Sequence, residues 1–196
     1  MAKRKGPAKN NSRPGRLRIV AGKWRSRLLP VVDVDGLRPT SERIRETLFN
    51  WLAGEITGSH CMDPFAGTGA LAFEAMSRGA ASATLIDNSR RIVESLLNSA
   101  ELLNADNARI LCADGLSFMQ QKASRHYDIV FLDPPFAEDI VEDCCRLLQS
   151  NGWLTDHAAV YIEQAKGRPQ PELPPGWTLE KDNKAGNVRF MLARPD

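Results

Sequence analysis

The sequence predicts a doubly wound α/β fold, in which a mostly parallel sheet carries helices on both faces. From residue 60 onward, short apolar segments rich in strand-forming residues alternate with helical segments. Two of the apolar segments end abruptly, one at Asp63-Pro-Phe-Ala-Gly-Thr-Gly and the other at Asp133-Pro-Pro-Phe. Such turns at the carboxyl ends of parallel strands are typical of the ligand sites of this fold class.

Length and composition agree with one globular domain. The chain has 196 residues, of which 42% are hydrophobic and 26% charged. No apolar run approaches the roughly 20 residues of a membrane span, and the basic N-terminus lacks the apolar segment of a signal peptide, so we expect a cytoplasmic protein. The cysteines and histidines lack zinc-site spacing, so we expect no metal. Cys61 and Cys112 lie in expected strands and are predicted to be small core residues.

The charge is distributed unevenly along the chain. Residues 1–32 hold ten Lys or Arg and no Asp or Glu, whereas the remainder holds 16 basic and 24 acidic residues, a net charge of −8. A basic N-terminal region on an acidic body favours a polyanionic partner such as nucleic acid. A solvated tail that aids solubility is the alternative. Residues 1–15 have almost nothing apolar and are expected to be a disordered basic tail.

Two short strands, 17–20 and 24–29, are expected to form a hairpin around Ala21-Gly22-Lys23. Its basic side chains are placed to follow a phosphate backbone, with Trp24 available to stack on a base. These side chains are Arg16, Arg18, Lys23, Arg25 and Arg27. Alternatively, Trp24 anchors the hairpin to the body of the protein.

A helix is expected from Thr40 or Ser41, either of which can cap it, to about residue 53. Arg38, Arg43 and Arg45 lie at its start, where cations oppose the helix dipole. Helix electrostatics therefore do not explain these arginines. Binding a carboxylate or a phosphate would explain them, and exposed, solvated arginines are the alternative.

The remaining elements follow in regular order. Strands are expected at 60–62, 82–86, 108–111, 129–132 and 158–162, and helices at about 70–78, 90–103 and 138–148, with a short helix after Asp114-Gly115. Two further strands, 177–180 and 188–193, are expected to form a hairpin around residues 184–187. Strands joined by helices in this way require right-handed crossovers and give a mostly parallel sheet.

The first turn has the chemistry of an adenosine-cofactor site. Gly67 and Gly69 lack a Cβ where the strand turns into the helix, so a ligand can approach the backbone closely. Asp87, at the end of the next strand, suits the hydroxyls of a ribose, and Asp114 is placed to meet an adenine edge. The run from Gly67 to Ala72 also matches a dinucleotide pattern. The acidic Asp63-Pro-Phe start disfavours a pyrophosphate and suits a cationic amino acid group instead.

The second turn, Asp133-Pro134-Pro135-Phe136, suits a nucleobase that carries an amino group. Its two prolines stop the strand and stiffen the turn. Asp133 and the Pro134 carbonyl can each accept one N–H of the amine, which would aim the nitrogen lone pair at an electrophile. Phe136 can stack on the base, a contact worth roughly 1–3 kcal/mol. An ordinary strand end followed by a proline turn is the alternative.

Together these motifs resemble S-adenosylmethionine-dependent amino-methyltransferases. Two further stretches, Arg16-Leu-Arg-Ile-Val-Ala-Gly-Lys-Trp-Arg and Gly36-Leu-Arg-Pro-Thr-Ser-Glu-Arg-Ile-Arg, bring the sequence closer to one family. The full set resembles the bacterial ribosomal RNA small subunit methyltransferase D family, which methylates guanine N2 in 16S rRNA. The resemblance extends from Arg16 to Arg194.

The resemblance implies a Rossmann-like, class I methyltransferase fold with a seven-stranded, mostly parallel sheet whose last strand is antiparallel. It implies a tail at 1–15, an N-terminal hairpin and helix at 16–55 that contact RNA, and a methyltransferase domain at 56–196. Its cofactor-binding positions are Asp63, Phe65, Ala66, Gly67, Thr68, Gly69, Asp87, Asn88, Asp114 and Gly115, with Arg38 and Thr40 closing over cofactor and substrate. Asp133, Pro134, Pro135 and Phe136 would hold the target base.

The implied partner is small-subunit rRNA in a 30S particle with its ribosomal proteins, bound by a monomer. The RNA contacts would come from Arg16, Arg18, Lys23, Trp24, Arg25, Arg27 and Arg43. Three alternatives stay open: a DNA or RNA adenine-N6 methyltransferase, a nicotinamide oxidoreductase, and a non-catalytic RNA-binding assembly factor. Asp133 stands where many adenine-N6 enzymes have Asn, which favours guanine.

Overall fold

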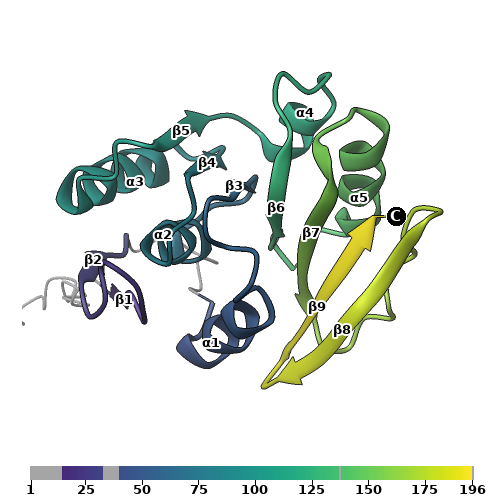
Figure 1. Cartoon of the computed structure of the whole chain (residues 1–196), viewed down its shortest axis with the longest axis horizontal. Helices are drawn as coiled ribbons and strands as arrows, with labels where there is room; N and C mark the ends of the chain where they lie inside the picture. The colour runs from purple at the N-terminus through teal and green to yellow at the C-terminus, as the bar shows by residue number, and fades with distance from the viewer. Residues whose placement is uncertain (1–14, 33–39, 137, 196) are drawn as a thin grey trace, which may run out of the picture.

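A seven-stranded sheet forms the centre of the computed structural model, which describes residues 15–32, 40–136 and 138–195. The strand order is β5-β4-β3-β6-β7-β9-β8 (Figure 1). The strands are β3 (His60–Asp63), β4 (Ser82–Asp87), β5 (Ala108–Cys112), β6 (Tyr127–Leu132), β7 (Leu154–Ala165), β8 (Trp177–Ala185) and β9 (Val188–Pro195). β9 runs antiparallel to both of its neighbours, and all other pairs in this sheet are parallel. The predicted mostly parallel sheet with an antiparallel last strand is confirmed.

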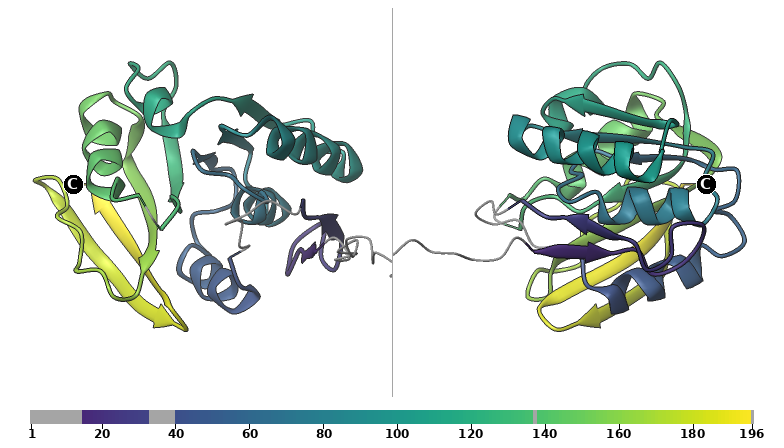
Figure 2. Two further views of the ribbon diagram at one scale, coloured as in Figure 1. Left: turned by 180° about the vertical axis from the view of Figure 1, so that it is seen from behind. Right: turned by 90° about the vertical axis from the view of Figure 1, so that its left-hand side faces the viewer.

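Helices cover both faces of this sheet (Figures 1 and 2). Phe131 and Tyr161 belong to a core shared with α1 (Glu42–Trp51), α2 (Ala70–Ser77) and α3 (Arg90–Leu103). Val130 and Leu132, one residue away along β6, belong to a second core with α4 (Gly115–Met119) and α5 (Val141–Ser150). Because successive side chains of a strand point to opposite faces, an apolar run such as β6 supplies both cores. The fold is therefore doubly wound, as predicted.

The order of the strands reverses at the centre of the sheet. The chain passes outward from β3 to β4 and β5, and then returns to β6 on the other side of β3. In open α/β sheets, ligands bind at the carboxyl ends of the strands at such a switch point. The Asp63 and Asp133 turns follow β3 and β6, so both predicted motifs lie there.

The N-terminal hairpin consists of β1 (Arg16–Arg18) and β2 (Leu28–Pro30), which pair as an antiparallel two-stranded sheet. Its strands are shorter than predicted, because residues 19–27 form turns closed by bonds such as Ile19 N to Arg27 O at 2.9 Å. Trp24 is only 7% exposed and belongs to the core. It therefore anchors the hairpin, and the expectation that it stacks on a base is wrong because its ring is buried.

Other differences concern the edges of the fold. β7 and β8 are longer than predicted and α5 begins later, at Val141. β8 is an edge strand with many exposed polar residues, which obscure its periodicity in the sequence. Cys61 is buried as predicted, whereas Cys112 is exposed at the end of edge strand β5, so its assignment to the core is wrong. None of the helices in the described ranges combines the length and the apolar composition that crossing a bilayer requires.

Candidate active site

Three acidic side chains gather at the carboxyl end of the sheet: Asp63 ends β3, Asp133 follows β6, and Glu163 lies two residues before the end of β7. Leu132 pairs with Ile162, so the next residues, Asp133 and Glu163, occupy matching positions on neighbouring strands, which lie about 4.8 Å apart. Asp63 ends β3 on the other side of β6. Burial raises the pKa of both Asp63 and Glu163, and charge repulsion by Asp133 raises both further. Three carboxylates therefore interact at the switch point of the sheet.

Asp63 is almost fully buried, and its Oδ1 atom has no hydrogen-bond partner among the described residues. Burial raises its pKa well above the usual range, and Asp133 raises it further. A buried carboxylate without a partner is costly, and a cationic amine is the group that would offset this cost. The surroundings of Asp63 thus fit the cationic amino acid part of the expected cofactor, the group that the sequence predicts for this turn.

The glycine-rich turn after Asp63 is held from the next strand. Gly67 N–H donates to Asp87 Oδ2 at 3.1 Å, and Ser89 N–H donates to Asp87 Oδ1 at 2.9 Å. Gly67 and Gly69 have φ of 49° and 73°, the left-handed region that favours glycine. A Cβ on Gly69 would lie 2.6 Å from Phe73. Gly69 therefore allows the turn to pack on α2, and its expected contact with a ligand stays a prediction.

The other expected cofactor residues lie at the same end of the sheet. Asp87 is partly buried at the end of β4, and burial raises its pKa. Asp114 is exposed and caps α4 through a 2.7 Å bond from Ser117 N–H. Hydrogen bonds from the side chain and the backbone of Ser117 lower its pKa. A Cβ on Gly115 would lie 2.2 Å from the Pro64 carbonyl oxygen, so Gly115 packs against the first turn. Phe65 and Thr68 are partly buried, Ala66 is buried and Asn88 is exposed.

In the second turn, Asp133 and Phe136 differ in their exposure to solvent. Asp133 is partly buried, and burial raises its pKa to about 6, although the Thr40 hydroxyl opposes this shift by donating to Oδ2 at 3.3 Å. Pro134 is buried, Pro135 is exposed and Phe136 is 40% exposed. The Phe136 ring is thus available for stacking. Thr40 is expected to close over the cofactor and substrate. In the structure its hydroxyl binds Asp133.

Glu163 and Tyr161 lie beside Asp133 in the candidate site, and no motif in the sequence identifies them. The Tyr161 hydroxyl donates to Glu163 Oε2 at 2.6 Å. Burial raises the pKa of Glu163 to about 8, and the nearby Asp133 raises it as well. The available signal was its position: like Asp133, Glu163 directly follows an apolar strand segment.

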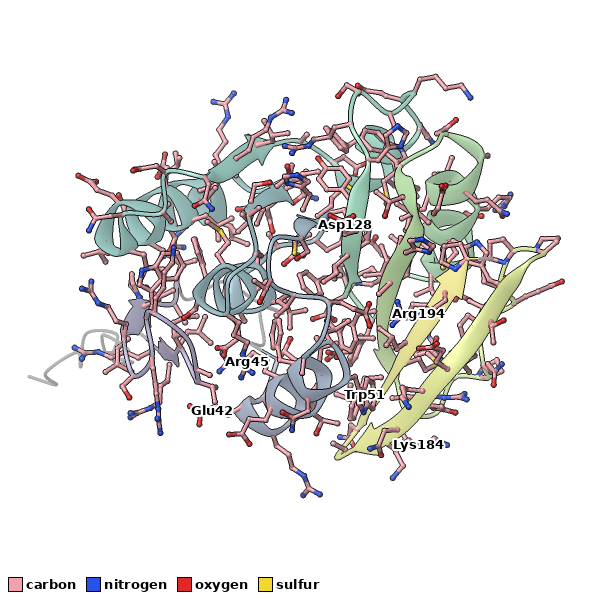
Figure 3. The ribbon with its side chains drawn as sticks, viewed as in Figure 1. Glu42, Arg45, Trp51, Asp128, Lys184 and Arg194 are labelled. Atoms are coloured by element: carbon pink, nitrogen blue, oxygen red, sulfur yellow. The ribbon has the colours of Figure 1, made fainter. Side chains whose placement is uncertain are left out.

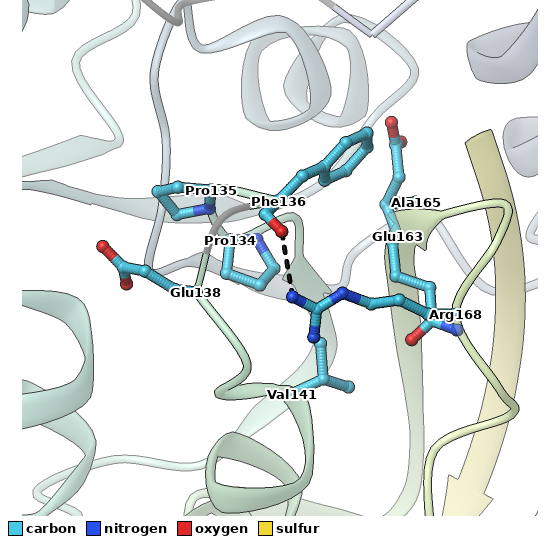
Figure 4. Close-up of a pocket in the computed structure, with 9 residues that line it drawn as sticks. Pro134, Pro135, Phe136, Glu138, Val141, Glu163, Ala165 and Arg168 are labelled. Carbon is cyan, nitrogen blue, oxygen red and sulfur yellow. Dashed lines mark hydrogen bonds between the residues drawn. The ribbon is translucent and has the colours of Figure 1, made fainter. Parts of the chain in front are cut away.

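Glu163 lines a small hollow with Pro134, Pro135 and Phe136 (Figure 4). Arg168 closes one side, donating to the Phe136 carbonyl oxygen at 3.0 Å and pairing with Asp139. This bond ties the second turn to the segment after β7. The hollow is therefore bordered by the turn expected to hold a base and by a buried carboxylate.

The predicted RNA-contacting arginines and lysine are exposed. They are Arg16, Arg18, Lys23, Arg25 and Arg27 on the hairpin, and Arg43 on α1. Arg27 donates to the Leu102 carbonyl at 2.8 Å, and Arg18 lies 3.8 Å from Glu42. Arg38, the other expected arginine, lies outside the described residues.

The hairpin is fastened to α2 through Glu74, which is fully buried. Its carboxylate accepts the backbone N–H of Val20 and Ala21 at 2.8 and 2.9 Å, and it pairs with Arg45 and Arg78 at 3.2 and 2.8 Å (Figure 3 labels Arg45). Of the arginines at the start of α1, Arg45 thus binds a carboxylate, and that carboxylate is internal. Since α2 starts directly after Gly69, one helix links the hairpin to the glycine-rich turn.

Comparisons with known proteins cover nearly the whole chain. Residues 17–194 match the family described as Conserved hypothetical protein 95. A protein of Escherichia coli K12 named ribosomal RNA small subunit methyltransferase D is 46% identical over 183 residues, which are 93% of this chain and 92% of that protein.

Solved structures are similar to this chain over nearly the same length. An Escherichia coli protein provisionally named a methyltransferase has 43% identity and a TM-score of 0.87, covering 93% of this chain and 99% of its own. A Haemophilus influenzae protein provisionally named a methylase has 38% identity and a TM-score of 0.80, covering 92% of this chain and 98% of its own. The similarity therefore includes the N-terminal hairpin as well as the central sheet.

Proposed function

Because the chain belongs to the ribosomal RNA small subunit methyltransferase D family, we propose that it transfers a methyl group from S-adenosylmethionine to the exocyclic N2 of one guanine in 16S rRNA. The substrate is an assembled or assembling 30S particle with its ribosomal proteins, and the enzyme acts as a monomer. The observation that carries this proposal is that the Asp63 and Asp133 turns end adjacent strands, close enough for their carboxylates to interact.

The cofactor supplies an activated methyl group on a sulfonium, so the chain has to align the donor and the acceptor. The unpaired Oδ1 of Asp63 receives the cationic amine of the methionine part. Asp87 holds the ribose with oxygens that already fix the Gly67 turn, and Asp114 with Gly115 borders the adenine. Good alignment of reactants contributes roughly 7–11 kcal/mol to lowering a barrier.

The acceptor nitrogen is held by the second turn. Asp133 and the carbonyl of Pro134 accept the two N–H bonds of guanine N2, and the exposed ring of Phe136 stacks on the base. The carboxylate of Asp133 stabilises the positive charge that develops on the nitrogen as the new bond forms. The guanine has to leave its stack to reach this turn, which costs a few kcal/mol and least in a loop.

The hairpin and the start of α1 dock the RNA. Arg16, Arg18, Lys23, Arg25, Arg27 and Arg43 place cations on the exposed surface of the hairpin and of α1, the helix that begins two residues after Thr40, the residue bound to Asp133. Phosphate contacts of this kind position a nucleic acid without reading its sequence. The 16–55 segment thus acts as an RNA-docking extension of the 56–196 catalytic domain.

A direct test uses small subunits from cells that lack this enzyme, purified protein and radiolabelled S-adenosylmethionine, followed by nucleoside analysis. We expect N2-methylguanosine in 16S rRNA. N6-methyladenosine would instead support the adenine enzyme, which shares the same turn chemistry. Binding to the particle without methyl incorporation would support an assembly factor, and both of these outcomes would overturn the guanine-N2 proposal.

A further inference from the structure

The buried Glu163 carboxylate has no part in the reaction as described above. Asp63 serves the cofactor and Asp133 serves the acceptor nitrogen, whereas Glu163 lies one strand beyond Asp133, at the matching position of β7. It borders the hollow formed by Pro134 and Phe136, and it is only 4% exposed. A carboxylate is costly in such a place, so its function needs an explanation.

We propose that Glu163, held by Tyr161, reads the N1–H of the target guanine and so selects guanine over adenine. This inference rests on the proposed guanine-N2 activity and assigns its base specificity to a residue pair. Glu163 is then a specificity-determining residue, and Tyr161 is a positioning residue that acts through it.

The orientation of Glu163 supports this assignment. The Tyr161 hydroxyl donates to Oε2 at 2.6 Å, whereas Oε1 accepts no hydrogen bond from the described residues. One oxygen is thus fixed and the other is left for a donor. The Tyr161 ring packs against Phe131, with ring centroids 6.5 Å apart, so the hydroxyl itself has a fixed position.

Guanine offers two adjacent donors, which suit acceptors on neighbouring strands. A flipped base is read by hydrogen bonds to its Watson–Crick edge, and on guanine the N2 amine and N1–H are adjacent donors. Asp133 and Glu163 present acceptors from neighbouring strands, about 4.8 Å apart at the backbone. With N2 held at Asp133, the next donor along the edge points toward Glu163.

Adenine fails this arrangement for a chemical reason. If its N6 amine took the place of N2, the neighbouring N1 would present a lone pair to Glu163 instead of a hydrogen. When two acceptors face each other in a buried site, each loses a hydrogen bond without replacement. A base that creates such a pair is therefore bound much more weakly. Asp133 alone accepts from either amine, so the discrimination falls to Glu163.

The second turn is held in register with Glu163 by Arg168. Its guanidinium donates to the Phe136 carbonyl at 3.0 Å (Figure 4) and also pairs with Asp139. The bond joins the segment after β7 to the turn after β6. The stacking ring and the proposed N1–H acceptor are therefore kept at a constant separation.

The test compares two acceptors in reconstituted small subunits at pH 9, where Glu163, whose pKa burial raises to about 8, is ionised and can only accept hydrogen bonds. The acceptors are guanosine and 2-aminopurine riboside at the position that nucleoside mapping identifies. 2-Aminopurine keeps the N2 amine but has an N1 lone pair in place of N1–H. For the wild type we expect a strong preference for guanosine. In Glu163→Gln, the Tyr161 hydroxyl binds the amide oxygen, so the amide NH2 faces the base and donates to the N1 lone pair. We expect the guanosine to 2-aminopurine rate ratio to fall roughly 10- to 100-fold.

Glu172→Gln, an exposed glutamate in the loop before β8, is the matched control and should keep the wild-type ratio. Cofactor binding measured by calorimetry should be within threefold of wild type for all variants, which separates base selection from loss of the fold. If Glu163→Gln fails to bind the cofactor, Tyr161→Phe carries the test, because it releases Oε2 while keeping the ring; its ratio should fall severalfold.

The outcomes separate the two proposals. If the wild type labels no guanosine, the guanine-N2 activity itself fails. If the wild type labels guanosine but Glu163→Gln, or Tyr161→Phe where it is needed, keeps the wild-type ratio, the activity stands and the role of Glu163 is overturned. A lowered ratio with unchanged cofactor binding supports the assignment.

Discussion

Two buried acidic regions of this molecule differ in how their charge is satisfied. Under the hairpin, the Glu74 carboxylate accepts two backbone N–H groups and pairs with Arg45 and Arg78. At the switch point of the sheet, Asp63 has an oxygen without a partner, and Asp133 and Glu163 repel each other. Both regions lie against the same core, on the α1–α3 face of the sheet.

The difference separates structure from function. A buried carboxylate that is surrounded by donors holds chain segments together, and removing it leaves its partners unsatisfied. Carboxylates buried with few donors, such as Asp63 with its unpaired oxygen, destabilise the empty protein and gain partners when a cationic or N–H-bearing ligand binds. Substitutions in the two regions should therefore have opposite effects on stability.

The largest effect is expected for Glu74→Gln. The change leaves the nearly fully buried Arg45 guanidinium without its carboxylate, and breaking a buried pair from one side costs about 3–5 kcal/mol. Urea unfolding should show a loss of this size. Asp63→Asn is the contrast: it should keep or raise the free energy of unfolding while weakening cofactor binding. A loss below about 1 kcal/mol for Glu74→Gln would contradict the structural role of this residue.

Asp133→Ala should lower the rate of methyl transfer by roughly 10²–10³-fold, the usual effect of losing one preorganised electrostatic group. The dissociation constant of S-adenosylmethionine should change less than threefold, because Asp133 serves the acceptor. Single-turnover assays and calorimetry measure the two quantities. Asp106→Ala, an exposed residue after α3, is the control. Wild-type turnover by Asp133→Ala would remove its assigned role.

The pH dependence sharpens the comparison. Since the pKa of Asp133 is about 6 in the fold and about 3.9 when unfolded, the folded protein binds this proton more tightly. Protonated Asp133 contributes to the free energy of unfolding at pH 4, and this contribution is lost as the pH rises to about 6. The free energy of unfolding of Asp133→Asn should therefore exceed that of the wild type by about 3 kcal/mol at pH 8 and by much less at pH 4. Urea unfolding at both values tests the sign. The wild-type rate should also fall below about pH 6.

The smallest effects are expected on the hairpin surface. Arg16→Ala and Arg25→Ala each remove one cation that makes no ion pair within the described residues. Each should reduce the slope of log K against log salt by roughly 0.7 for single-stranded RNA. Lys181→Ala, exposed on β8, is the control and should leave the slope unchanged. Unchanged slopes for both arginines would count against docking by the hairpin.

The sequence predicted the central sheet well because its strands are apolar runs that end in distinctive turns. The helix at 90–103 was predicted with the bounds that α3 has, since Ser89 caps it and its apolar residues recur at helical spacing. β8 was underestimated because its polar residues, such as Lys181 and Asp182, pair with β9 rather than follow an apolar pattern. Strand pairing of that kind is a tertiary effect.

Within the site, residue types were easier to predict than their partners. Asp63, Asp87 and Asp133 were identified from their positions after strands. Thr40 on Asp133 and Tyr161 on Glu163 depend on contacts between distant or neighbouring segments that no local pattern encodes. Gly69 shows the same limit, because its missing Cβ is explained by the Phe73 and Leu96 side chains that only the fold brings near.

The attachment of the hairpin has a consequence for engineering. Gly22 sits where any Cβ would overlap the Ser77 carbonyl, and Glu74 lies one turn earlier on the same helix. In a chimera that carries the hairpin of a relative, the transplanted hairpin would therefore not match the contact residues of α2 unless α2 were exchanged as well. To direct this protein to another RNA, the hairpin and α2 should thus be exchanged together, along with the glycine-rich turn that precedes α2.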